Sequence, residues 1–157
     1  MTLKDQLNAD LRDAMRAGDE TRKTTLRLLI TAIRNAEIPP EGAATDVSRQ
    51  ELTDDAVLNV VRREVKQRRD SMDAYAKANR QDLVAKEEAE LNVLSLYLPA
   101  QMSRAEVEAV AKTIIERVGA SGPADKGKVM PAIMAELRDK AEGREINAVV
   151  TELLGGS

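Results

Sequence analysis

The sequence predicts an all-α fold, with a four-helix N-terminal domain over residues 1–98 and a small three-helix C-terminal domain over residues 99–157. Apolar residues recur at three- and four-residue spacing along most of the chain, and no segment alternates as a strand does. Phe and Trp are absent and only 2 tyrosines are present, so Leu, Val, Ile, Met and Ala must fill the core, as in helical packing. Charged residues make up 32%, which suits helices with solvated faces.

The first two helices are bounded by local signals. Thr2 is a cap for a helix that ends at Gly18, and Asp19 caps the next helix, which ends near Ile38. The first apolar stripe consists of Leu3, Leu7, Leu11 and Met15. Two prolines and a glycine without apolar periodicity predict a loop over residues 39–50.

Two more helices complete the predicted N-terminal domain. Thr53 caps the third, and Asp54 and Asp55 in its first turn favour the positive end of the helix dipole. A fourth helix is predicted from about Asp82 to Tyr97 by its apolar leucines.

The C-terminal domain is predicted to begin at Pro99, because the residue before a proline is forced out of the helical region. Ser103 and Glu106 form a capping-box pattern ahead of an apolar series. Asp125 is predicted to cap the next helix, and Gly143 separates that helix from the last. A three-helix unit of this size folds alone only marginally.

Composition excludes several kinds of function. Cysteine and histidine are both absent, which excludes disulfides, thiol nucleophiles, Cys/His zinc sites and histidine acid–base chemistry. Neither a metal nor another cofactor is expected. No apolar run approaches the ~20 residues of a membrane span, and the N-terminus lacks a signal-peptide pattern. We therefore expect no membrane partner and a cytoplasmic location. Net charge is −3, so any basic surface must be local.

The stretch GPADKGKVM at residues 122–130 resembles a phosphate loop. Gly122, Gly127 and Lys128 fit that pattern, but Val129 stands where a hydroxyl is needed, and no strand precedes the stretch. A nucleotide site is therefore disfavoured. Two interpretations remain. The stretch is a turn with a helix cap, or Lys126, Gly127 and Lys128 receive a phosphate group at the helix N-terminus.

Two rows of basic residues fall on single helical faces by their spacing. One row consists of Arg62, Lys66 and Arg69, and the other of Lys23, Arg27 and Arg34. The alternative is an ordinary solvated face, balanced by nearby acidic residues. Because single-strand recognition usually stacks bases on aromatic side chains, which are scarce here, the rows favour structured RNA.

Several stretches together resemble the YqeY family, also labelled GatB/YqeY. They are TTLRLLITAIRNAEI, EVKQRRDSMDAY, EEAELNVLSLYLPAQMS, GKVMPAIM and AEGREINAVVTELL, so the resemblance covers nearly the whole chain. The sequence departs from the family pattern in a longer loop at residues 39–50 and in Asp139, where the family usually has glycine.

This resemblance implies the same helical architecture and a similarity to the tail of the B subunit of the tRNA-dependent amidotransferase, a tail associated with holding tRNA. It implies association with tRNA, and since the sequence lacks the residues for catalysis, we expect a non-catalytic, tRNA-associated module. Its partners would be tRNA or another structured RNA, together with an aminoacyl-tRNA synthetase or an amidotransferase.

Two alternative functions stay open. One is carbon–nitrogen ligase activity with glutamine as amido-N-donor, which the family label implies. The absence of a Cys or His nucleophile–base pair and of an intact phosphate loop speaks against it. The other is a helical protein–protein adaptor, whose apolar groove would be lined by Met102, Met130 and Met134.

Overall fold

The computed structural model describes residues 1–39, 50–137 and 140–155. In these ranges the secondary structure consists of α-helices and one short 3₁₀ helix, with no strand, so the predicted all-α class is confirmed. The chain divides into two compact units, Met1–Leu98 and Pro99–Ser157, and each is described by itself. Independent folding of these units as domains stays a prediction.

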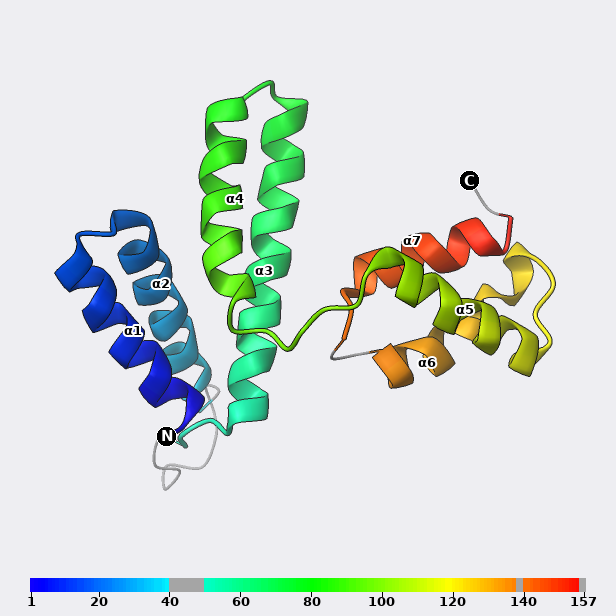
Figure 1. The fold of residues 1–157 in the computed structure, drawn as a ribbon, viewed down its shortest axis with the longest axis horizontal. Helices are drawn as coiled ribbons and strands as arrows, with labels where there is room; N and C mark the ends of the chain where they lie inside the picture. The colour runs from blue at the N-terminus through cyan, green and yellow to red at the C-terminus, as the bar shows by residue number, and fades with distance from the viewer. Residues whose placement is uncertain (40–49, 138–139, 156–157) are drawn as a thin grey trace. The chain divides into compact units, whose positions relative to one another are not determined.

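The N-terminal unit is built from two helical pairs (Figure 1). It contains α1 (Leu3–Ala17), α2 (Glu20–Ala36), α3 (Asp54–Lys77) and α4 (Gln81–Ser95). α1 packs on α2, α3 packs on α4, and α2 contacts both α3 and α4. The core between them is aliphatic, and its fully enclosed members include Leu7, Leu26, Leu29, Ile33, Val57, Val61 and Leu94.

The C-terminal unit is a smaller cluster of three helices. It contains α5 (Arg104–Val118), the 3₁₀ helix η1 (Pro123–Asp125), α6 (Lys126–Leu137) and α7 (Gly143–Leu153). Each of the three α-helices contacts the other two. Their shared core includes Val107, Ile114, Val129, Ile133, Ile146, Val149 and Val150.

Most helix ends lie where the sequence predicts them, because their capping bonds are local. Thr2 and Ser103 each form a complete capping box, and the side chains of Asp19 and Thr53 accept hydrogen bonds from backbone N–H groups of α2 and α3. Gly18 ends α1 in the left-handed conformation that glycine adopts most easily.

The predicted Asp125 cap is wrong, the fourth helix begins one residue before its predicted start, and the predictions for the 39–50 loop and for position 139 fall largely outside the described residues. Asp125 does not cap α6. It is the last residue of η1, which runs directly into α6, and its carboxylate accepts the backbone N–H of Ser121 at 2.9 Å. The predicted fourth helix begins at Gln81, after Arg80, without a side-chain cap. Apart from its two ends, the loop at 39–50 lies outside the described residues, as does position 139.

A buried ion cluster divides the α3–α4 hairpin. The guanidinium of Arg68 lies 2.5 Å from the Glu64 carboxylate and 3.6 Å from the Glu90 carboxylate. Beyond this cluster, no residue between 69 and 89 is buried. The outer part of the hairpin therefore consists of two helices that pack on each other without a core of their own.

Candidate nucleic-acid interface

Helix α2 carries the most one-sided charge distribution in the described structure. Its residues 21–36 include 4 cations, Arg22, Lys23, Arg27 and Arg34, and no carboxylate. Arg27 and Arg34 are exposed, and the Lys23 ammonium pairs with Glu20 at 2.8 Å. Arg22 faces inward to Asp10 of α1, at 3.8 Å. The predicted row of Lys23, Arg27 and Arg34 thus lies along one accessible edge of α2.

The second predicted row lies on α3, where polar side chains of the same helix already bind two of its members. Lys66 is exposed and pairs with Asp70 at 2.9 Å, and the half-buried Arg62 donates to the Asn59 side chain at 2.7 Å. Arg69 is also half-buried. The α2 row and the α3 row thus lie on two different helices.

Sequence reasoning omitted one residue of the α3 surface and did not predict the burial of another. Arg63 is exposed, and with Lys66 and Asp70 it borders a shallow depression of about 390 Å³ on the outer side of α3. Arg68, in the same basic run, instead points into the unit, where it pairs with Glu64 and Glu90. Helical spacing relative to Val61 and Val65 was the signal available for the burial of Arg68.

The third predicted cluster stands at the start of α6, in the C-terminal unit. Lys128 is exposed and lies 3.5 Å from the Asp125 carboxylate, while Lys126 is half-buried. Gly127 is exposed and helical, its φ is not left-handed, and a Cβ atom added there would meet nothing within 4 Å. Neither packing nor backbone conformation among the described residues therefore requires glycine at this position.

Pro131 offers a structural reason for Gly127. Pro131 lies inside α6, four residues after Gly127, and it has no N–H to donate to the Gly127 carbonyl. A proline ring also crowds the carbonyl four residues earlier, and a glycine there adjusts most easily. This local explanation and the approach of an external phosphate are both compatible with the geometry.

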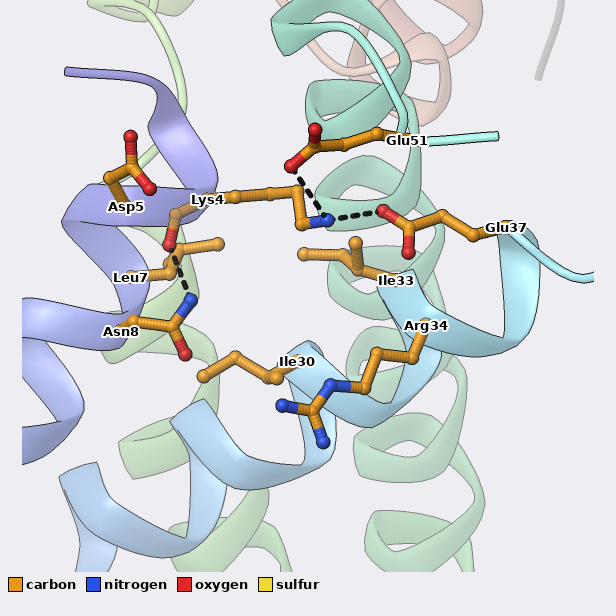
Figure 2. Close-up of a pocket in the computed structure, with 9 residues that line it drawn as sticks. All are labelled: Lys4, Asp5, Leu7, Asn8, Ile30, Ile33, Arg34, Glu37 and Glu51. Carbon is orange, nitrogen blue, oxygen red and sulfur yellow. Dashed lines mark hydrogen bonds and ion pairs between the residues drawn. The ribbon is translucent and has the colours of Figure 1, made fainter. Parts of the chain in front are cut away.

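Figure 2 shows a hollow between α1, α2 and the segment that leads into α3. Its volume is about 350 Å³. The Lys4 ammonium lies 2.5 Å from Glu37 and 3.3 Å from Glu51, and the Glu37 side chain is only 4% exposed. The hydrogen bond to Glu37 raises the pKa of Lys4. Glu37 also accepts the backbone N–H of Leu52 at 3.3 Å.

Lys4 of α1 thus binds Glu37 and Glu51, the residues that flank the 39–50 loop on its two sides. The Lys4–Glu37–Glu51 cluster therefore has a structural role, which is to hold α1, the end of α2 and the start of the segment before α3 together. Arg34 lines the same hollow, so this member of the α2 row shares its surroundings with carboxylates. No sequence motif marks this cluster, because its members come from three separate segments.

The methionines proposed for an adaptor groove have another role. Met102, Met130 and Met134 are all half-buried and pack against the C-terminal core. The Met102 backbone N–H also donates to the Lys140 carbonyl at 2.7 Å. This packing is what core residues show, and the adaptor hypothesis stays an untested prediction. Across the part of the chain that the structure describes, no helix is long and apolar enough to cross a membrane.

Taken together, the fold and these surfaces define a small all-helical protein with cationic helix edges. The chain matches the family model described as Yqey-like protein over residues 4–154, and it belongs to that family. The resemblance found in the sequence is confirmed.

Several similar curated proteins are fungal and are named "Altered inheritance of mitochondria protein 41, mitochondrial". The one from Lachancea thermotolerans is 35% identical over 120 residues, which are 74% of this chain and 60% of that protein. The one from Vanderwaltozyma polyspora is 39% identical over 92 residues, 59% of this chain and 46% of that protein. The one from Pyrenophora tritici-repentis is 27% identical over 154 residues, 96% of this chain and 80% of that protein.

Against the first two relatives, the chain spans only about half to three-fifths of the curated protein's length. The names of all three relatives point to the mitochondrion. They contradict the cytoplasmic location expected from the sequence, which is therefore wrong as a prediction.

Proposed function

We propose that this protein is a non-catalytic helical module that binds structured RNA of the tRNA class. The distribution of charge on α2 carries the proposal. In a chain of net charge −3, residues 21–36 concentrate 4 cations without one carboxylate. Such a local positive edge attracts phosphates, although the whole protein does not.

The other two clusters support the same function. The α3 row adds Arg62, Lys66 and Arg69, with Arg63 beside them, and the start of α6 adds Lys126 and Lys128. The Lys126 backbone N–H already donates to the Pro123 carbonyl, so this cluster offers its two ammonium groups to a phosphate. The ion pair of Lys66 with Asp70 is exposed, so a phosphate can replace the carboxylate at small cost.

The test is equilibrium binding of a fluorescently labelled tRNA transcript at several salt concentrations. Removing one cation that binds a phosphate should lower the salt slope by roughly 0.7–0.9. Three double variants address the three clusters: Lys23→Gln with Arg27→Gln, Arg62→Ala with Lys66→Ala, and Lys126→Ala with Lys128→Ala. At least one should weaken binding and reduce the slope.

A matched control removes a cation that has a carboxylate partner elsewhere on the surface. Arg117 is exposed on α5 and pairs with Glu136 at 3.0 Å. Arg117→Gln should leave both affinity and salt slope unchanged. If all three double variants behave like this control, the proposed RNA-binding surface does not exist. Ammonia release from glutamine by the purified chain would instead overturn the non-catalytic part. An aminoacyl-tRNA synthetase or an amidotransferase remains the proposed protein partner, to be sought by co-purification with and without nuclease.

A further inference from the structure

The exposed side of α2 has a second, uncharged edge beside its cations. Thr24, Leu28, Thr31 and Asn35 follow one another at spacings of four, three and four residues, and all are exposed. Positions three and four apart share one side of a helix. Leu28 leaves 48% of its surface accessible. This edge, Thr24–Leu28–Thr31–Asn35, therefore runs parallel to the edge formed by Lys23, Arg27 and Arg34.

Within the described residues, the polar side chains on this edge have no hydrogen-bond partner. The side chains of Thr24, Thr31 and Asn35 make no hydrogen bond to any residue that the structure describes. Their neighbour Thr25 differs, because it is buried and its hydroxyl donates to the Thr21 carbonyl at 2.8 Å. Threonine and asparagine are poorer helix formers than alanine, lysine or glutamate. Local helix stability therefore does not explain their presence on an accessible face.

The two edges together fit one chemical class of partner. The cationic edge calls for a polyanion, and Arg27 is its exposed member that contacts a neutral group of α1. The Arg27 guanidinium lies 3.8 Å from the Met15 sulfur, whereas Arg34 lies in the hollow that Asp5 and Glu37 also line. The second edge offers hydroxyl and amide groups, each able both to donate and to accept a hydrogen bond. Duplex RNA offers a partner for both edges, because phosphates and ribose 2′-hydroxyls lie side by side along its surface.

We infer that the exposed side of α2 binds the minor-groove side of double-stranded RNA, reading ribose 2′-hydroxyls with Thr24, Thr31 and Asn35. In RNA duplexes this groove is wide and shallow and displays the 2′-hydroxyls beside the phosphates. At ~1.5 Å of rise per residue, the distance from Thr24 to Asn35 is about 16 Å, so the edge can contact several nucleotides. Lys23 and Arg27 contact the bordering phosphates. The inference rests on the proposed RNA binding, and it specifies the ligand of this surface as an RNA duplex rather than a DNA duplex.

The test compares the affinities of the full-length protein for an RNA hairpin and for a DNA hairpin of the same sequence. The wild type should prefer RNA. Thr24→Ala with Thr31→Ala should lower the RNA-to-DNA affinity ratio about tenfold, as expected when two hydrogen bonds are removed, without changing the salt slope. Because alanine favours the helix, circular dichroism should show an intact fold.

Two controls separate hydroxyl recognition from other effects. Thr24→Ser with Thr31→Ser keeps both hydroxyls and should keep the wild-type ratio. Thr113→Ala with Thr151→Ala changes threonines on α5 and α7 whose hydroxyls bond to their own helices, and it should also keep the ratio. An unchanged ratio in the Thr24/Thr31 alanine variant would overturn the inference while RNA binding itself stands. Absence of salt-dependent binding to either hairpin would overturn the proposed function as well.

Discussion

Replacing Arg68 tests the energetic role of the buried ion cluster. The side chains of Arg68, Glu64 and Glu90 are only 8%, 17% and 10% exposed. Arg68→Met keeps a chain of similar length but leaves two carboxylates facing each other without a cation. Breaking a buried pair in this way costs about 3–5 kcal/mol. A domain of this size has a total stability of roughly 5–15 kcal/mol, so the loss should be large.

Urea unfolding of the full-length chain, followed by circular dichroism, measures the effect. The N-terminal transition should move to lower urea, and hydrogen exchange should show faster opening of residues 69–89, which have no buried residue to hold them. The double variant Arg68→Met with Glu90→Met removes the more buried of the two stranded carboxylates and should recover part of the loss. Lys66→Met, in an exposed pair with side chains 77% and 60% accessible, serves as the control. A loss below about 1 kcal/mol for Arg68→Met, or no recovery in the double variant, would refute this reasoning.

Three further predictions concern single positions. Gly127→Ala should raise the free energy of unfolding by about 0.5–1 kcal/mol in urea titrations, because glycine destabilises a helix and nothing lies within 4 Å of the added Cβ. A decrease in the free energy of unfolding would show that the glycine relieves strain at Pro131. The N–H of Ser121 lowers the pKa of Asp125, so the stability that this carboxylate contributes is present above pH ~4 and is lost as pH falls through its folded-state pKa. The gap in urea midpoint between wild type and Asp125→Asn should therefore close in acid, and a gap independent of pH would contradict it. Burial, with the hydrogen bond to Asp10, raises the pKa of Tyr97, so stability should fall as pH rises above ~10 in wild type and fall less in Tyr97→Phe.

The sequence predicts helix existence and most helix starts because the responsible interactions are local. Thr2, Asp19, Thr53 and Ser103 each bond to a backbone N–H three residues ahead, so the four capping patterns are legible without any tertiary information. Asp125 shows the limit of this logic. Its residue type suits a cap, but the 3₁₀ turn formed by Pro123–Asp125 places it inside helical structure, and its carboxylate turns back to Ser121.

The candidate site was predictable only as a set of residue types and spacings. Helical periodicity places Lys23 and Arg27 on one accessible edge of α2, and in the structure Arg27 is exposed and Lys23 is half-buried. The same periodicity does not reveal which basic residues have carboxylate partners. Asp70 is a sequence neighbour of Lys66 and could be anticipated, whereas the hollow at Arg34 depends on residues from three separate segments.

The sequence by itself determined the helical class, the family and the absence of thiol and imidazole chemistry, since composition and local hydrogen bonding suffice for these. Only the tertiary structure decided that Arg68 pairs with Glu90 of α4, and that Glu37 is enclosed against Lys4. Burial and ion pairing depend on segments that are distant in sequence and adjacent in space. The sequence around a carboxylate such as Glu37 is the same whether a remote helix or solvent covers its side chain, so the local sequence does not reveal its burial.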